Sequence, residues 1–261
     1  MSVVELEHVS VIRDGRAILN DVSWQVNEGE RWVVLGPNGA GKSTLLAVIS
    51  TRLYPTSGSV RVLDEEVGAV DLTELKPRIG LVNAGVVAHI PVSETVANVV
   101  LTAAWAVTGR WTEEYEAADE ARAQALLVQF DIAKHADRSF GTLSDGERKR
   151  TLVARAVMAD PEVLFLDEPA AGLDLGAREE LVHLLGELAN DPAAPAVVLI
   201  THHVEEIPPG FTHALLMRDG AVVAAGPIET VLTGSLLTTA FGTALTVTGS
   251  DGRWSARSIW S

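Results

Sequence analysis

The chain of 261 residues contains no cysteine, and aromatic residues make up only 5% of it. The absence of cysteine excludes disulfides and thiolate metal sites. Positive charge is also scarce, because 20 lysine and arginine residues face 35 aspartate and glutamate residues, which gives a formal net charge of -15. A surface this acidic repels a phosphate backbone, so we expect no nucleic acid partner.

Long hydrophobic runs are missing as well. The most apolar window, VANVVLTAAWAV at residues 96–107, is too short to span a bilayer and contains Asn98 and Thr102. The opening segment, MSVVELEHVS, has neither the basic start nor the apolar run of a signal peptide. We therefore expect a cytoplasmic protein that is peripheral on the inner face of the cell membrane only when it binds a partner chain.

The remaining composition and patterning predict an α/β protein. Hydrophobic residues make up 47% of the chain, which suits one large domain, or one domain with a small subdomain. The first 35 residues alternate in polarity and predict short antiparallel strands. Residues 93–140 are mostly helical in pattern, with helices expected after Ser93 and after Thr112. Apolar runs at residues 162–168 and 196–203 predict buried parallel strands.

Residues 36–43, GPNGAGKS, match the phosphate-binding pattern G-x-x-x-x-G-K-[ST] between a strand-like and a helix-like segment. Glycines let backbone N–H groups turn inward around phosphate oxygens, and the helix N-terminus adds its positive end. We expect Lys42 to reach the β- and γ-phosphates and Ser43 to bind Mg²⁺. A glycine-rich turn without a ligand is the alternative, which the complete pattern disfavours. The residues expected around the phosphates are Gly36, Pro37, Asn38, Gly39, Ala40, Gly41, Lys42, Ser43 and Thr44.

Two acidic residues, Asp167 and Glu168, end the apolar segment VLFLDE. In a P-loop fold such a strand lies beside the phosphate loop, with its carboxyl end toward the nucleotide. Asp167 would hold Mg²⁺ through water, and Glu168 would polarise the attacking water. His202 follows the next buried segment, which should adjoin the strand of Glu168, so we favour it over His203. Solvated acids and a structural histidine are the alternatives.

The segment TLSDGERKR, residues 142–150, allows two interpretations. Ser144 and Glu147 match the S-x-x-E capping box, which could simply stabilise a helix that runs to about Ala159. Gly146, however, lies in the first helical turn, where glycine lowers helix stability. A group that approaches the backbone would explain this glycine, and an exposed helix start with a serine hydroxyl can bind phosphate. We do not expect one chain to bring this helix start onto its own phosphate loop.

In chain order, the segments GPNGAGKST, LSDGE, VLFLDEP, AGLD and THH resemble the motifs of the ATP-binding subunit of an ABC transporter. The likeness covers roughly residues 3–230, and DRSFGTLS is most similar to bacterial subunits of the molybdate and iron-chelate uptake type. It implies a P-loop NTPase fold with an N-terminal antiparallel β-subdomain and a helical subdomain at about residues 85–141. The ATPase domain would comprise residues 1–235. Residues 236–261 would form a C-terminal extension, whose pattern predicts a β-hairpin.

The resemblance also implies an ATPase that uses ATP and Mg²⁺ and dimerises head to tail with a second copy. In the family, the signature of one copy binds the γ-phosphate held by the P-loop of the other; here it comprises Ser144, Gly146 and Glu147. Asp174 would lie at the dimer contact, and His202 would sense the γ-phosphate. Separate transmembrane permease subunits would dock on the helical subdomain. The implied catalytic residues are Lys42, Glu168 and His202, and the implied metal ligands are Ser43 and Asp167.

The sequence departs from the family in two places. The family usually places an aromatic residue under the adenine, and this chain has Arg13 at that position. A guanidinium plane can stack on a purine, so Arg13 is either an adenine contact or a solvated turn residue. The family also has a glutamine that touches Mg²⁺, and its position falls on Ala84. Because successive side chains of a strand alternate in direction, we expect Asn83 to face away from the phosphates.

Three functions are compatible with these motifs. The first is an ATPase that drives solute transport by separate membrane subunits. The second is a soluble, non-transport ABC ATPase of the assembly type. The third is a nucleotide-sensing module without turnover, against which the presence of both Glu168 and His202 argues.

Overall fold

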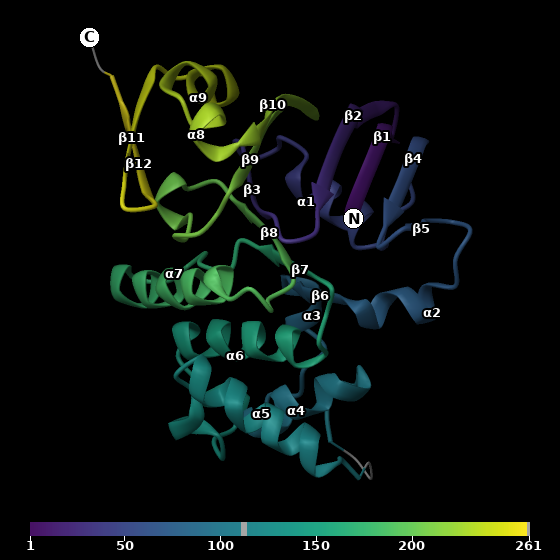
Figure 1. Ribbon diagram of the computed structural model, residues 1–261, viewed down its shortest axis with the longest axis vertical. Helices are drawn as coiled ribbons and strands as arrows, with labels where there is room; N and C mark the ends of the chain where they lie inside the picture. Colours follow the sequence, from purple (N-terminus) through teal and green to yellow (C-terminus); the bar gives the residue numbers. More distant parts are fainter. Residues whose placement is uncertain (111–113, 260–261) are drawn as a thin grey trace.

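The computed structural model describes residues 1–110 and 114–259, which form two sheets, a terminal hairpin and a group of helices (Figure 1). The first sheet is antiparallel, in the order β2-β1-β4-β5. Buried and exposed residues alternate along much of β2, because one face of this sheet packs on the core and the other faces solvent. Its strands are β1 (Ser2–Arg13), β2 (Arg16–Asn27), β4 (Ser57–Val62) and β5 (Glu65–Glu66).

The second sheet has six strands in the order β10-β9-β3-β8-β7-β6, and all except β10 are parallel. Every residue of β3 and β8 is buried, as expected of central strands that are covered on both faces. The phosphate loop, Glu168 and His202 follow β3, β7 and β8, so the topology gathers them at one edge. Its strands are β3 (Arg31–Leu35), β6 (Ile79–Val82), β7 (Val163–Asp167), β8 (Ala196–Thr201), β9 (His213–Arg218) and β10 (Ala221–Pro227).

Helices α4, α5 and α6 build the lower lobe of Figure 1, whereas α8 and α9 lie at the top of the view. The α-helices are α1 (Lys42–Ile49), α2 (Leu72–Leu75), α3 (Ala84–Val87), α4 (Val96–Leu101), α5 (Ala117–Gln129), α6 (Asp145–Met158), α7 (Leu175–Asn190), α8 (Ile228–Val231) and α9 (Gly234–Phe241). The 3₁₀ turns are η1 (Lys76–Arg78), η2 (Thr102–Trp105), η3 (Ala133–His135), η4 (Phe140–Thr142) and η5 (Val204–Glu206).

Two helix starts differ from the sequence predictions. Thr95, rather than Ser93, caps α4, because its hydroxyl accepts the N–H of Asn98, three residues later, at 3.3 Å. The next helix, α5, begins only at Ala117. The cap predicted at Thr112 lies outside the described residues.

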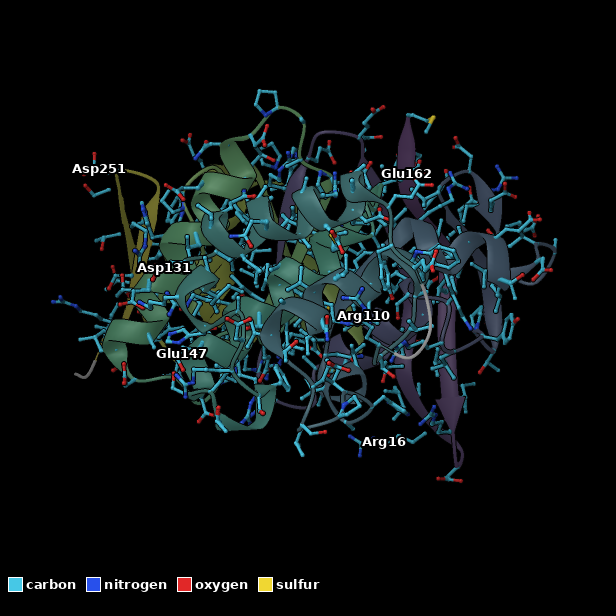
Figure 2. The ribbon with its side chains drawn as sticks, turned by 90° about the horizontal axis from the view of Figure 1, so that it is seen from below. Arg16, Arg110, Asp131, Glu147, Glu162 and Asp251 are labelled. Carbon is cyan, nitrogen blue, oxygen red and sulfur yellow. The ribbon has the colours of Figure 1, made fainter. Side chains whose placement is uncertain are left out.

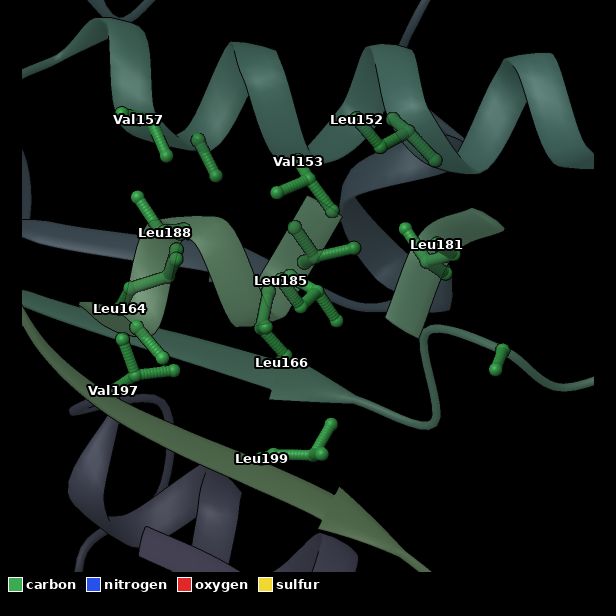
Figure 3. Packing of buried hydrophobic residues seen from close by; sticks show 14 of the residues in the cluster. Leu152, Val153, Val157, Leu164, Leu166, Leu181, Leu185, Leu188, Val197 and Leu199 are labelled. Carbon is green, nitrogen blue, oxygen red and sulfur yellow. The ribbon is translucent and has the colours of Figure 1, made fainter. Parts of the chain in front are cut away.

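The core between the lobes has three layers (Figure 3). Helix α7 lies between α6 on one side and strands β7 and β8 on the other. Burial of this apolar surface holds the acidic end of β7 in fixed relation to α6. The residues labelled in Figure 3, which come from all three layers, are Leu152, Val153, Val157, Leu164, Leu166, Leu181, Leu185, Leu188, Val197 and Leu199.

A buried arginine ties α6 to the helical lobe. Arg155 donates hydrogen bonds to the carbonyl of Val99, to the hydroxyl of Thr102 at 2.9 Å and to the carbonyl of Val107 at 2.7 Å. Burial lowers the pKa of Arg155 to about 10, so the guanidinium remains charged at neutral pH. These bonds join α6 to the end of α4 and to the segment that follows it.

The chain ends in a hairpin of β11 (Leu245–Ser250) and β12 (Arg253–Ser258), drawn in yellow beside α9 at the edge of the molecule (Figure 1). Among the residues that the structure describes, no helix has the length and apolar character needed to cross a bilayer.

Candidate functional site

Helix α1 presents an open N-terminus. Its first residue is Lys42, and the residue before it, Gly41, has a left-handed φ of 98° and no capping side chain among the described residues. By contrast, Thr95, Ser144 and Asp174 cap α4, α6 and α7 with their own side chains. The first N–H groups of α1 are therefore available to an anion, which the positive end of the helix also attracts.

The glycines of the phosphate loop are required by packing as well as by curvature. A Cβ atom on Gly36 would lie 2.4 Å from the carbonyl oxygen of Met217 in β9. A Cβ atom on Gly41 would lie 2.8 Å from the carbonyl oxygen of Ile18 in β2. The loop is thus pressed between the two sheets, and side chains at these positions would push it away.

The side chain of Lys42 bonds to the backbone of the phosphate loop. Its Nζ donates to the carbonyl of Gly36 at 2.6 Å and to that of Pro37 at 3.1 Å, and the side chain is buried. Burial lowers the pKa of Lys42, whereas the nearby carboxylates of Glu168 and Asp167 raise it. The cation lies beside a hollow of about 300 Å³ lined by Arg16, Ile18, Asn38, Gly39, Ala40, Gly41, Lys42, Ser43, Thr44 and Glu168.

A second hollow of about 300 Å³ adjoins the first, and Ser43 and Glu168 line both. The Ser43 hydroxyl and the Glu168 carboxylate lie at this junction, and the Asp167 carboxylate lines the second hollow beside them; such hard oxygen donors fit Mg²⁺. Burial and the neighbouring Glu168 raise the pKa of Asp167, whereas Lys42 and Lys149 lower it. The second hollow is lined by Ser43, Val82, Asn83, Ala84, Val87, Lys149, Leu152, Asp167, Glu168 and Ala171.

Glu168 and His202 are in direct contact at the sheet edge. Nδ1 of His202 lies 3.0 Å from Oε1 of Glu168, whereas the exposed His203 only packs its ring against His202 at 4.1 Å. Glu168 has a φ of 45°, in the left-handed region, and its N–H donates to the carbonyl of Ile200 in β8 at 2.9 Å. A left-handed conformation outside glycine is uncommon and clusters at functional sites, where the surrounding structure holds it.

The start of α6 forms the complete capping box. The Ser144 hydroxyl accepts the N–H of Glu147 at 3.3 Å, and the Glu147 carboxylate accepts the N–H of Ser144 at 2.8 Å. The backbone bond from Ser144 is the largest effect that lowers the pKa of Glu147. A Cβ atom on Gly146 would lie 2.9 Å from Cβ of Ala177 in α7, so this glycine is explained by packing within the chain. Gly146 by itself therefore gives no separate evidence for a bound ligand, and its contact with a nucleotide stays a prediction, as does that of the exposed Ser144.

The start of α6 is remote from the phosphate loop of its own chain. Figure 2 labels Glu147 in the first turn of α6 and Arg16 beside the phosphate loop, and the two lie well apart. The first turn of α6 is thus separated from the residue that lines the hollow of the phosphate loop. This separation agrees with the expectation that one chain does not bring both onto the same nucleotide.

The sequence left Arg13 as either an adenine contact or a solvated turn residue, and in the structure Arg13 does not line the first hollow. Among the described residues around the first hollow, Arg16 is the arginine that lines it, and Arg13 is not included. Arg13 ends β1, whereas Arg16 begins β2 after the tight turn at Asp14 and Gly15. Sequence reasoning missed Arg16, although both arginines flank the same turn in RDGR.

The expectation for Asn83 rested on a strand that ends earlier than assumed. Strand β6 stops at Val82, and Asn83 caps the short helix α3 by accepting the N–H of Val86 at 2.9 Å. Both Asn83 and Ala84 line the second hollow, so strand alternation does not turn Asn83 away. Lys149 in α6, which the sequence did not single out, lines the same hollow.

Comparisons with known proteins agree with this geometry. A family model described as ABC transporter matches residues 19–171. The chain is 41% identical over 246 residues to the uncharacterized ABC transporter ATP-binding protein YlmA of Bacillus subtilis, covering 94% of this chain and 93% of the relative. It is 36% identical to the hemin import ATP-binding protein HmuV of Rhodococcus jostii, covering 90% of this chain and 78% of the relative.

Solved structures share the same architecture. The ATP-binding cassette MJ0796, dimeric in a post-hydrolysis state with ADP and Pi, has a TM-score of 0.74 at 25% identity, covering 86% of this chain and 98% of that one. CbiO1 of Clostridium perfringens has a TM-score of 0.78 at 25% identity, with 91% and 93% covered. These relatives do not support the non-transport ATPase or the sensor without turnover. The chain belongs to the ABC transporter family, as an ATP-binding subunit that hydrolyses ATP to drive transport.

Proposed function

We propose that this subunit hydrolyses MgATP at the junction of the two hollows, with Glu168 as the base. The observation that carries this proposal is the contact of 3.0 Å between Glu168 and His202. It lies at the sheet edge where the phosphate loop follows β3. Glu168 accepts a proton from the attacking water, which a carboxylate within hydrogen-bond reach can do. His202 holds the Glu168 carboxylate in place through their contact of 3.0 Å and would also sense the γ-phosphate.

The other site residues bind and orient the nucleotide. The N–H groups at the start of α1 and the cation of Lys42 bind the phosphates. Ser43 and Asp167 would hold Mg²⁺, which neutralises charge on the phosphate oxygens. Ser43 lines both hollows and Asp167 lines the second, so these two side chains could hold the metal near the junction of the hollows.

Replacement of Glu168 by glutamine separates binding from hydrolysis. Glu168→Gln keeps the shape of the side chain but removes the base, so we expect ATP affinity within about twofold and a turnover rate lower by about 100-fold or more. Calorimetry and a phosphate-release assay measure the two quantities. Glu187→Gln, at an exposed position of α7, is the matched control and should leave both unchanged. Full hydrolysis by Glu168→Gln would contradict the assignment of the base.

The nucleotide site is completed by a second copy of the chain. Ser144 is exposed at the positive end of α6, and the first turn of this helix, marked by Glu147, lies well apart from Arg16 beside the phosphate loop (Figure 2), which supports contact with the nucleotide of a partner. Asp174, the exposed cap of α7, would lie at the same dimer contact. The dimer is therefore head to tail, with each nucleotide held between the P-loop of one copy and the Ser144 end of the other.

The permease subunits would dock around residues 87–92. On one side of this segment, Val87, Ile90 and Val92 line an apolar groove of about 530 Å³ that continues over Phe140. Val92 is 71% exposed. A surface of this kind, open and apolar, marks an interaction site in a protein otherwise rich in charge.

On the other side, Arg52, Lys76 and His89 line a hollow of about 650 Å³. This basic cluster stands out in a chain with a net charge of -15. Both hollows suit one occupant, a cytoplasmic helix of a permease that carries apolar and acidic side chains. This contact would hold the subunit on the inner face of the cell membrane, in the cytoplasm. Since relatives of similar identity are named for hemin and for phosphonate import, the permease and not this subunit would select the solute.

A charge placed in the apolar groove tests the docking site. Val92→Asp should reduce the amount of subunit that copurifies with membranes by about tenfold, because a buried, unpaired carboxylate is costly. Ile12→Asp is the control, since Ile12 is exposed on the antiparallel sheet, far from the groove. ATPase activity of the free subunit should stay unchanged in both variants. Equal membrane binding of the two variants would contradict docking at this groove.

A further inference from the structure

The C-terminal hairpin is bonded to two segments that flank the catalytic edge. In β12, Arg253 Nη1 lies 2.8 Å from Oε2 of Glu179, in the second turn of α7. The other terminal nitrogen of this guanidinium, Nη2, donates to the carbonyl of Glu205 in η5 at 3.1 Å. One planar side chain thus joins helix α7 to the turn that follows β8.

Further contacts fix the hairpin on this turn. The N–H of Ala256 donates to the carboxylate of Glu205 at 3.1 Å. The backbone of Gly252 approaches Pro209 so closely that a Cβ atom there would lie 3.3 Å from the proline ring. Val247 and Trp254 pack against the main hydrophobic core. The hairpin is therefore an integral part of the fold at this place, and Arg253 is held in a defined geometry.

The turn that Arg253 contacts carries His202. Inside the protein, the Thr201 hydroxyl donates to the buried carboxylate of Glu206 and accepts the N–H of His203 at 3.1 Å. Outside, Arg253 and Ala256 hold Glu205, three residues after His202. Two sets of hydrogen bonds therefore hold the turn that places His202 against Glu168. One is formed by Thr201 and Glu206 inside the protein, and the other by Arg253 and Ala256 on its outside.

We propose that Arg253 is a positioning residue for His202 and links that histidine to helix α7. The proposal rests on the proposed role of His202 beside Glu168. Helix α7 begins directly after Asp174, at the proposed dimer contact, so a shift of α7 reaches the His202 turn through Glu179 and Arg253. Arg253 touches neither nucleotide hollow, so it acts on turnover and leaves nucleotide affinity alone.

Single variants measure the size of this effect. Arg253→Ala should lower kcat about threefold, which corresponds to about 0.7 kcal/mol, while KM for ATP stays within about 1.5-fold. Glu179→Gln breaks the same ion pair from the α7 side, leaves the hairpin sequence intact and should give the same result. The control is Arg257→Ala in the same strand, since Arg257 is exposed and its side chain forms no hydrogen bond or ion pair within the part of the chain that the structure describes. Wild-type kcat in both Arg253→Ala and Glu179→Gln would overturn the proposal.

A double variant separates positioning of His202 from general stabilisation. If Arg253 acts through His202, Arg253→Ala should change the residual kcat of His202→Ala by less than about 1.5-fold, because the two effects are coupled. A threefold loss that persists in the His202→Ala background would overturn the proposal. His202→Ala alone tests the role of the histidine: wild-type turnover there would remove the proposed function of His202 and leave the measured effect of Arg253 as a separate fact. The ring resonances of His202 should also shift in Arg253→Ala and not in Arg257→Ala.

Discussion

At the scale of single residues, local motifs in the sequence predict which chemical groups the site contains. They do not predict every residue that lines it. Lys42, Ser43 and Glu168 come together as their motifs predict, because parallel strands end at one edge of the sheet. Arg13 and Arg16 show the limit of this reasoning. Both flank one turn, and which of them reaches the phosphate loop depends on the packing of Ile18 against Gly41, a contact between distant segments.

The two arginines can be compared by ATP affinity. We expect Arg16→Ala to weaken ATP binding by about 1 kcal/mol, or roughly fivefold, the size of one cation–π or stacking contact. Arg13→Ala should change it less than twofold, as should the control Arg61→Ala at an exposed position of β4. Titration calorimetry of each variant with ATP measures the affinities. A larger loss in Arg13→Ala than in Arg16→Ala would restore Arg13 as the adenine contact.

At the scale of elements, helix and strand types were predictable, and their ends depended on caps and neighbours. The box of Ser144 and Glu147 marks the start of α6 as the sequence indicated. By contrast, the need for glycine at position 146 comes from the close approach of Ala177 in α7. This is a tertiary contact, which the sequence TLSDGERKR alone cannot predict. The end of β6 also escaped prediction, because Asn83 competes for backbone bonds and begins a helix where the apolar pattern continues.

The cap at Asn83 gives a test at this scale. Asn83→Ala removes the acceptor for the N–H of Val86 and should lower the free energy of unfolding by about 1 kcal/mol or less. We expect the ATPase rate to change by less than about threefold, since this oxygen already accepts a backbone bond. Asn83→Ser keeps a cap and should recover the melting temperature. A rate as low as that of Ser43→Ala would instead place Asn83 on the metal.

At the scale of the whole molecule, charge and geometry set the condition for dimerisation. Two copies with a net charge of -15 each repel one another, so the head-to-tail dimer needs the contacts that bound nucleotide supplies. Each nucleotide would join the phosphate loop of one copy to the Ser144 end of the other. The dimer should therefore form only while ATP stays intact, which Glu168→Gln ensures.

A single charge at Ser144 tests this assembly without loss of the fold. Aspartate is as good a helix cap as serine, so Ser144→Asp preserves the start of α6 while placing a negative charge against the γ-phosphate of the partner. In MgATP, Glu168→Gln should elute from size exclusion as a dimer, and Glu168→Gln with Ser144→Asp as a monomer with unchanged ATP affinity. The control pairs Glu168→Gln with Thr248→Asp, which adds the same charge at an exposed position of β11 and should remain dimeric. If the Ser144→Asp double variant dimerises equally well, Ser144 acts only as the cap of α6 and does not contact the nucleotide of a partner.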